Sequence, residues 1–150
     1  MKIYFGADHR GFEAKEKLLS YFTDNANDYV VVDKGSFDFD PEDDYNDSAS
    51  AVAEAVLEDE GSRGVLICGS GVGMAIQANR YQGVRAAVCH SCKEVELARS
   101  HNNINILCLA ADFTSKYKMK RLIRSFLETD FIRSEKYVRR NLKLDQWKEK

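Results

Sequence analysis

Residues 64–74, which read GVLICGSGVGM, decide the fold of this chain. Residues 65–67 form a short, continuous apolar run, which is typical of a strand buried on both faces of a parallel sheet. Alternating glycines follow at once, and they let the backbone turn sharply and approach a ligand closely. We therefore predict a strand over Gly64–Cys68, a glycine loop over Gly69–Gly73 and a helix from about Met74.

Four further apolar runs indicate strands on either side of this stretch: Lys2–Ala7, Tyr29–Asp33, Val84–Cys89 and Ile104–Ala110. Segments with helical spacing separate them. The apolar stripes of these helices are Ala49, Val52, Ala53, Val56 and Leu57, which Gly61 ends; Phe12, Leu18, Leu19 and Phe22; and Tyr117, Leu122, Ile123, Phe126 and Leu127. Such alternation predicts right-handed βαβ units. We expect an α/β fold, a Rossmann-like three-layer sandwich with a five-stranded parallel sheet and a C-terminal helix, in a single domain over residues 1–150.

The composition is that of an ordinary globular protein, with 44% hydrophobic and 31% charged residues. It excludes collagen, disordered and disulfide-rich classes. No apolar stretch approaches the roughly 18 residues of a membrane span, and no signal peptide opens the chain, so we expect a cytoplasmic protein without a membrane partner. Residues 116–150 hold 12 Lys and Arg against 5 Asp and Glu. Because no nucleic-acid motif accompanies this charge, we interpret it as a solvated helix surface and expect no nucleic-acid partner.

The residues just after each strand are the candidates for function, since ligands of open parallel sheets bind beyond the carboxyl ends of the strands. Asp8 and His9 follow the first strand. The carboxylate can contact a sugar hydroxyl and the imidazole a phosphate, although Asp8 could equally well cap the next helix.

Cys68 at the mouth of the glycine loop is the most distinctive residue. The positive end of the following helix favours the thiolate form, and the loop turns a row of N–H groups toward a ligand. A thiolate at this position can remove a proton from carbon while the N–H donors hold the resulting oxyanion.

Three other features have plausible structural explanations. Cys89-His90-Ser91-Cys92 could be a redox dithiol, but no second pair completes a zinc site, and cytoplasmic thiols stay reduced. His101 near a helix end could be a cap or a site residue. The acidic loop holds Asp38, Asp40, Glu42, Asp43, Asp44 and Asp47, whose spacing fits no calcium loop, and we interpret it as solvated.

In this order, these segments resemble the ribose-5-phosphate isomerase B family, which includes the galactose-6-phosphate isomerase subunits. The resemblance covers almost the whole chain. It rests on Asp8-His9-x-Gly11-Phe12, Asp33-x-Gly35, Asp44-Tyr45-x-Asp47, Ile67-Cys68-Gly69-Ser70-Gly71-Val72-Gly73, Ala78-Asn79-Arg80, Gly83-Val84-Arg85-Ala86 and Ala98-Arg99-x-His101-Asn102.

The resemblance implies an aldose–ketose isomerase of the pentose phosphate pathway, which interconverts ribose 5-phosphate and ribulose 5-phosphate through a cis-enediolate. It implies that Cys68 is the base and that Ser70 moves a proton between the two oxygens. Asp8 and His101 would open the sugar ring. The substrate-binding groups implied are the loop N–H groups of Gly69, Gly71, Val72 and Gly73, together with His9, Asn102, Lys136 and Arg140. The family also implies a homodimer or tetramer whose partner chain contributes His101 and Asn102, with no metal and no organic cofactor.

The chain departs from the family at the phosphate end. Lys136 and Tyr137 stand where the family has Arg and His, and Asp112 stands where it usually has Arg. A carboxylate there would repel a phosphate if it faces the ligand. Three hypotheses stay open: an isomerase of ribose 5-phosphate or of allose or galactose 6-phosphate, a non-catalytic sugar-phosphate-binding partner subunit, and a dithiol oxidoreductase.

Overall fold

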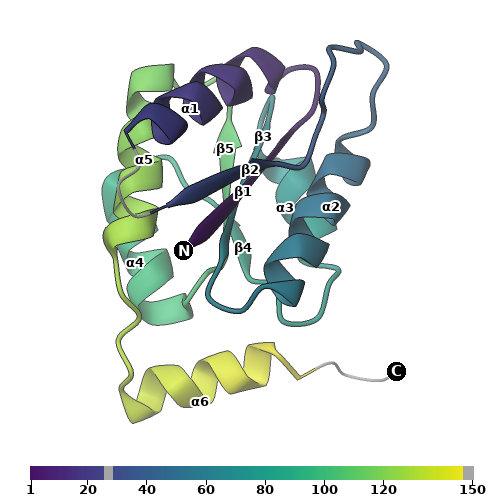
Figure 1. Ribbon diagram of the computed structural model, residues 1–150. Helices are drawn as coiled ribbons and strands as arrows, with labels where there is room; N and C mark the ends of the chain where they lie inside the picture. Colours follow the sequence, from purple (N-terminus) through teal and green to yellow (C-terminus); the bar gives the residue numbers. More distant parts are fainter. Residues whose placement is uncertain (26–28, 147–150) are drawn as a thin grey trace.

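The computed structural model describes residues 1–25 and 29–146, and its sheet has five parallel strands in the order β2-β1-β3-β5-β4 (Figure 1). The strands are β1 (Lys2–Ala7), β2 (Val30–Asp33), β3 (Arg63–Cys68), β4 (Ala86–Val88) and β5 (Ile106–Ala110). The predicted α/β fold with a five-stranded parallel sheet is confirmed.

Helices cover both faces of this sheet. They are α1 (Phe12–Asp24), α2 (Tyr45–Glu58), α3 (Val72–Ala78), α4 (Cys92–Asn102), α5 (Lys116–Glu128) and α6 (Glu135–Leu144). One apolar cluster joins the sheet to α1, α4 and α5, and a second joins it to α2 and α3. In β3, Val65 and Ile67 enter the first cluster while Leu66 and Cys68 enter the second. The predicted three-layer sandwich is therefore confirmed, and Cys68 faces the α2–α3 layer.

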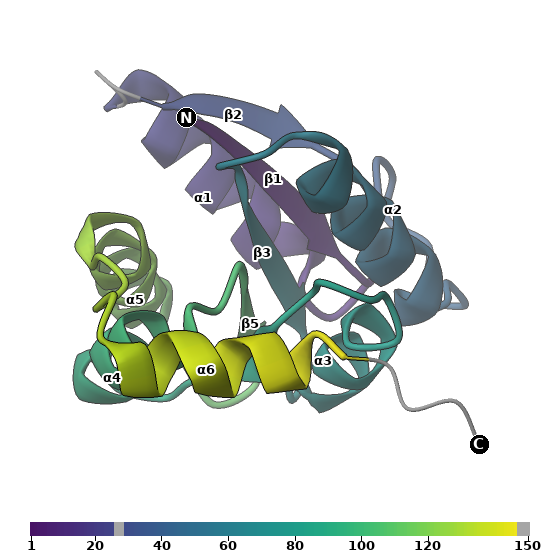
Figure 2. The ribbon, with the colours of Figure 1, turned by 90° about the horizontal axis from the view of Figure 1, so that it is seen from below.

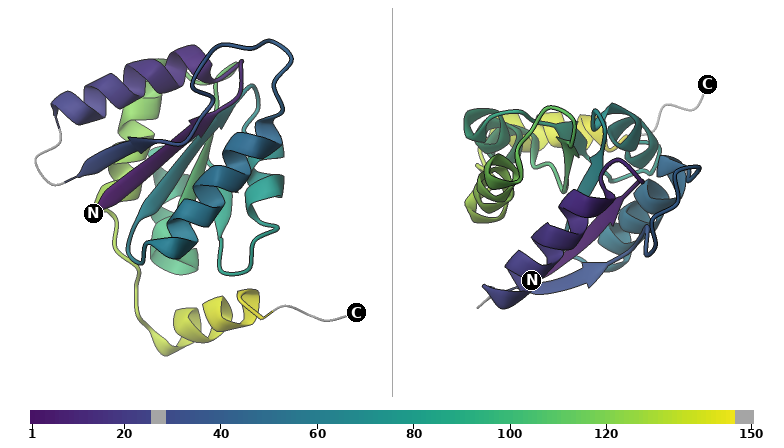
Figure 3. Two further views of the ribbon diagram at one scale, coloured as in Figure 1. Left: turned by 45° about the vertical axis from the view of Figure 1, so that its right-hand side comes forward. Right: turned by 90° about the horizontal axis from the view of Figure 1, so that it is seen from above.

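The strand order changes direction at β1. The chain leaves β1 to form β2 on one side and returns to form β3 on the other. Ala7 pairs with Ile67 at the ends of the two strands, and the Asp8 N–H donates to Ile67 O at 3.2 Å. Ligands of such sheets bind at this switch point, beyond the carboxyl ends of the strands. The right panel of Figure 3 looks down on that edge.

Helix α6, the predicted C-terminal helix, lies outside the three layers. It crosses beneath the sheet, at the edge where the strands begin (Figures 1 and 2). The glycine loop and α6 are therefore at opposite edges of the molecule. None of the helices within residues 1–25 and 29–146 is long and apolar enough to cross a membrane.

The structure differs from the predictions at a few element ends. β4 is shorter than Val84–Cys89 because the Arg85 N–H donates to the Asn105 side chain at 2.8 Å instead of joining a strand ladder. β5 begins at Ile106, two residues after the predicted start at Ile104. The Ile104 N–H donates a hydrogen bond to Ala98 O of α4 and therefore does not join the sheet. Two members of the predicted apolar stripes, Leu57 and Tyr117, are 43% and 73% exposed. Each lies in its predicted helix, near a helix end that the core does not reach.

Candidate active site

The ends of β1 and β3 bring Asp8, His9 and the glycine loop together, and we call Asp8, His9 and residues 68–73 the thiol half-site. Asp8 is 5% exposed, and its Oδ1 accepts a hydrogen bond from the Gly11 N–H at 2.9 Å. Asp8 therefore closes the turn before α1, but it does not cap that helix, because the N-cap is Gly11 and no side chain caps it. Burial raises the pKa of this carboxyl, so Asp8 holds a proton more readily than a solvated carboxyl does.

His9 is fixed by an acidic residue that lies far away in the sequence. Its Nδ1 lies 2.7 Å from Asp43 Oδ1, and the same oxygen accepts the His9 backbone N–H at 3.0 Å. The hydrogen bond to Asp43 raises the pKa of His9, which favours the positively charged ring. The interpretation of the acidic loop as solvated is therefore wrong for Asp43, whose side chain is 15% exposed. No cluster of three or more His, Cys, Asp or Glu suited to a metal ion occurs within the described part of the chain.

The Cys68 thiol is held beneath the glycine loop. The residue is 5% exposed, and its Sγ accepts the Gly71 N–H at 3.1 Å. Gly71 has φ +77°, and a Cβ there would lie 3.2 Å from the backbone of Leu109, so the turn requires glycine. Ser70 is exposed at the top of the loop, and its Oγ accepts the Val72 N–H at 3.3 Å. The thiol, a hydroxyl and backbone donors therefore share one small region.

Tyr45 packs against the glycine loop of this half-site, and the sequence analysis assigned no role to it. It is the first residue of α2, and a Cβ at Gly73 would lie 2.8 Å from its Cζ. The last glycine of the loop thus makes room for the aromatic ring. The only sequence signal was the position of Tyr45 within the segment Asp44-Tyr45-x-Asp47, because its contact with the loop depends on the tertiary fold.

Asp112 lies against the glycine loop and carries a partner of its own. Its N–H donates to Gly69 O at 3.0 Å, and its Oδ2 lies 2.5 Å from Arg10 Nη2. The negative charge of Asp112, which the sequence analysis expected at the phosphate end, is therefore paired with the guanidinium of Arg10. Arg10 was not among the predicted site residues, and its partner is 102 positions away.

The remaining predicted residues, His101, Asn102, Lys136 and Arg140, gather at the opposite edge, and we call them the histidine half-site. His101 and Asn102 end α4, which runs from the carboxyl edge of the sheet back to the edge where β5 begins. The eleven residues of α4 span about 16 Å. One copy of the chain therefore does not bring these residues to Cys68.

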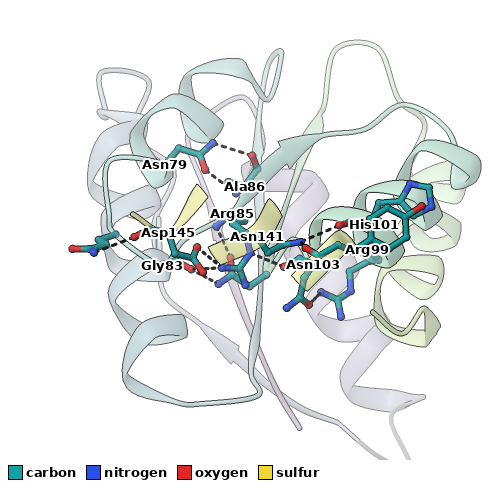
Figure 4. A network of polar contacts seen from close by, with 12 residues as sticks. Asn79, Gly83, Arg85, Ala86, Arg99, His101, Asn103, Asn141 and Asp145 are labelled. Atoms are coloured by element: carbon teal, nitrogen blue, oxygen red, sulfur yellow. Dashed lines mark hydrogen bonds and ion pairs between the residues drawn. The ribbon is translucent and has the colours of Figure 1, made fainter. Parts of the chain in front are cut away.

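Contacts with α6 hold His101 of the histidine half-site in place (Figure 4). The rings of His101 and Tyr137 stack with centroids 4.4 Å apart and an interplanar angle of 16°. Asn141 Nδ2 donates to His101 O at 3.0 Å, and an ion pair of 2.7 Å joins Arg85 Nη1 to Asp145 Oδ1 at the end of the helix. These contacts fasten α6 beneath the end of α4. Tyr137, which replaces the histidine of the family pattern, thus serves as a platform for His101.

The cysteines outside the glycine loop are poorly suited to redox chemistry. Burial raises the pKa of Cys89 to about 11 and also raises the pKa of Cys108. Both residues therefore stay as thiols at neutral pH, whereas disulfide exchange requires a thiolate. Cys89 and Cys92 are free in the structure. This geometry disfavours the dithiol hypothesis.

Comparisons with known proteins show the family of this chain. The ribose/galactose isomerase family model matches residues 3–144. Ribose-5-phosphate isomerase B of Escherichia coli (strain K12) is 35% identical over 130 residues, which are 87% of this chain and 85% of that protein. The crystal structure of a ribose 5-phosphate isomerase from Thermotoga maritima matches with a TM-score of 0.90 and 39% identity, covering 96% of this chain and 97% of that one. The Mycoplasma genitalium enzyme, solved with bound ribulose-5-phosphate, has a TM-score of 0.89 and 35% identity, covering 96% of this chain and 93% of that one.

Proposed function

The chain belongs to the ribose/galactose isomerase family, and we propose that it interconverts ribose 5-phosphate and ribulose 5-phosphate. The observation that carries this proposal is the buried Cys68 thiol, which accepts the Gly71 N–H and lies in the loop beside Asp8 and His9. A base and a set of oxyanion donors are the two elements that proton transfer between adjacent carbons requires. The relatives named ribose-5-phosphate isomerase B, one of them with bound ribulose-5-phosphate, support the choice of substrate.

In the proposed reaction, the Cys68 thiolate removes the proton from C2 of the open-chain aldose. The electron pair of that C–H bond forms the C1–C2 double bond, and the negative charge moves to O1. Backbone N–H groups of Gly69–Gly73 stabilise this enediolate. The Cys68 thiol then returns the proton to C1, while the Ser70 hydroxyl carries a proton from O2 to O1. Substrate and product have the same composition, so the reaction needs no external oxidant or reductant.

Ring opening comes before this step, because the sugar phosphate is mainly cyclic in solution. One group must take the proton of the anomeric hydroxyl and another must give a proton to the ring oxygen. We assign these tasks to Asp8 and to His101 of a second copy of the chain. The raised pKa of Asp8 makes proton exchange at this carboxyl easier at neutral pH.

We further propose that the active enzyme is a homodimer, or a tetramer built from dimers, with its sites between copies. The support is that the thiol and histidine half-sites lie at opposite edges of one chain, although both are assigned to one reaction. A two-fold axis would bring the half-sites of two copies together twice. We also place the enzyme in the cytoplasm, and its four free cysteines support a reducing compartment.

An isomerisation assay with purified protein tests the proposal. We expect turnover of ribose 5-phosphate to exceed that of allose 6-phosphate and galactose 6-phosphate. Faster turnover of either hexose phosphate would contradict the substrate assignment. Binding of ribose 5-phosphate without turnover of any of the three would favour the non-catalytic partner subunit instead.

A further inference from the structure

Arg10 and Asp112 form a charged pair directly against the glycine loop. The proposed reaction assigns no role to either residue. A Cβ at Gly69 would lie 2.6 Å from Arg10 Nε and 2.8 Å from Asp112 Oδ2. Gly69 follows Cys68 in the chain, so the guanidinium of Arg10 lies against the loop that begins at the thiol residue. Arg10 also follows His9 in the turn before α1, and its side chain is 56% exposed to solvent.

A cavity of about 400 Å³ opens beside this pair, between α1 and α5. Its lining includes Arg10, Thr114, Ser115 and Lys116. The carboxylate of Glu13 also lines the cavity, beside two cations and two hydroxyls of the kind that bind a phosphate. Lys116 already forms an ion pair with Glu13, with 2.7 Å between Nζ and Oε1. Hydrogen bonds from Lys116 and Lys17 lower the pKa of Glu13 to about 2. The ammonium of Lys116 is therefore shared with a carboxylate that stays ionised.

Arg10 has more capacity to bind an anion. A guanidinium carries five N–H donors in a planar fork, and the ion pair with Asp112 engages Nη2. The other donors can bind the oxygens of a phosphate, while Asp112 keeps the fork in a fixed orientation. The phosphate of a pentose 5-phosphate lies three carbons beyond C2, so a cation beside the thiol loop is within reach of it.

We propose that Arg10 binds the phosphate of the substrate in this chain, and that Asp112 is a positioning residue that orients the Arg10 guanidinium. This inference rests on the proposed function, because it assigns a residue to the same site. It explains how the chain manages without a cation at position 112. The cation reaches the loop from the end of β1, and the carboxylate at the end of β5 holds it.

The Asp112→Ala substitution distinguishes a positioning role from simple repulsion, because the two roles change KM in opposite directions. If Asp112 merely repelled the phosphate, removal of its negative charge would lower KM. As a positioning residue, its loss leaves Arg10 mobile, so KM rises despite the more favourable net charge. The double variant Arg10→Asp with Asp112→Arg restores an oppositely charged pair at the same place.

The test is steady-state kinetics with ribose 5-phosphate, together with inhibition by inorganic phosphate. We expect Arg10→Ala to raise KM and the inhibition constant of phosphate by about tenfold each, with kcat changed less than about twofold, because phosphate contacts are made equally in the ground and transition states. Asp112→Ala should raise KM by a smaller factor. The charge-swapped double variant should recover most of the loss seen with Arg10→Asp alone. Arg124→Ala on α5, where the side chain contacts Tyr21, is the matched control and should leave KM unchanged.

An unchanged KM in Arg10→Ala, or a loss confined to kcat, would overturn the assignment of Arg10. A lower KM in Asp112→Ala would overturn the positioning role. If the wild-type protein turns over a different phosphosugar, the same variants are measured on that substrate, which separates failure of this inference from failure of the proposed function.

Discussion

At the level of single residues, local structure distinguishes Cys68, the proposed base, from Cys89 and Cys108. Cys68 accepts a backbone N–H in a turn that opens toward solvent through the exposed Ser70. Cys89 and Cys108 are buried without such a donor among the hydrogen bonds of the described residues, and burial raises their pKa values. A buried thiol in apolar surroundings is inert, whereas a thiol facing N–H donors is available as a base.

We expect Cys68→Ala to lower kcat by about 10²–10⁴-fold, because the variant has no group in the loop that can remove the C2 proton. The substitution deletes only a sulfur atom, and we expect a cost in unfolding free energy of about 1 kcal/mol. NMR of the sugar phosphates measures turnover, and urea unfolding checks the fold. The double variant Cys89→Ala with Cys92→Ala is the control. Wild-type turnover by Cys68→Ala, or inactive but folded control protein, would refute this assignment.

The His9–Asp43 contact gives a prediction for pH dependence. The hydrogen bond that the His9 ring donates to Asp43 raises the pKa of His9, so the ring keeps its positive charge above the usual value of 6.5. If His9 faces the phosphate, affinity is retained below the raised pKa, and KM increases as pH rises through it. Asp43→Asn removes the carboxylate, so KM should begin to increase at lower pH. A KM profile that is identical in Asp43→Asn and wild type would show that the His9 charge does not contribute to binding.

At the scale of elements, a buried lysine fixes the loop that carries Asp43. Lys15 of α1 is 0% exposed, and its Nζ donates to Asp33 Oδ2 at 2.5 Å and to Ser36 O at 2.8 Å. These bonds join α1 to the end of β2 and to the start of the connection toward α2. The backbone of this connection also pairs with the end of β1, where the Ala7 N–H donates to Gly35 O at 2.7 Å. The position of His9 thus depends on an ion pair outside the site.

Lys15→Ala should therefore destabilise the fold by about 3 kcal/mol, because it leaves Asp33 without its buried partner. Urea unfolding measures this loss. Lys17→Ala on the same helix removes only an exposed pair with Glu13 and should cost much less unfolding free energy than Lys15→Ala. Equal losses in the two variants would mean that the buried pair does not stabilise the loop.

The sequence predicted the elements better than their contacts. Continuous apolar runs predicted all five strands, and burial on both faces explains these runs in the central strands β1, β3 and β5. The start of β4 was mispredicted because the Asn105 side chain accepts the Arg85 N–H, a contact that no local pattern reveals. Asp8, His9 and Cys68 could be expected to meet, since the carboxyl ends of parallel strands share one edge. The roles of Asp43, Tyr45 and Arg10 could not, because each meets its partner only through tertiary packing.

At the scale of the whole molecule, the site is divided between two edges. The thiol half-site lies where the strands end, while α6 and the end of α4 lie beneath the sheet (Figure 3, left). His101 is held there by the Tyr137 ring and by Asn141, so it is fixed in place without contacting its own chain's thiol loop. The proposed reaction requires both groups. Under this proposal, we expect a solitary chain to be inactive on the cyclic sugar and two copies to form two complete sites.

Complementation between two inactive variants tests whether Cys68 of one copy and His101 of another act on one sugar phosphate. Cys68→Ala and His101→Ala proteins are unfolded together, refolded as an equal mixture and assayed with ribose 5-phosphate, beside each variant refolded alone. Half of the dimers should then be mixed, and each mixed dimer has one intact site. We therefore expect about a quarter of wild-type activity from the mixture and almost none from either variant alone. A mixture no more active than the separate variants, although mixed dimers form, would contradict the account.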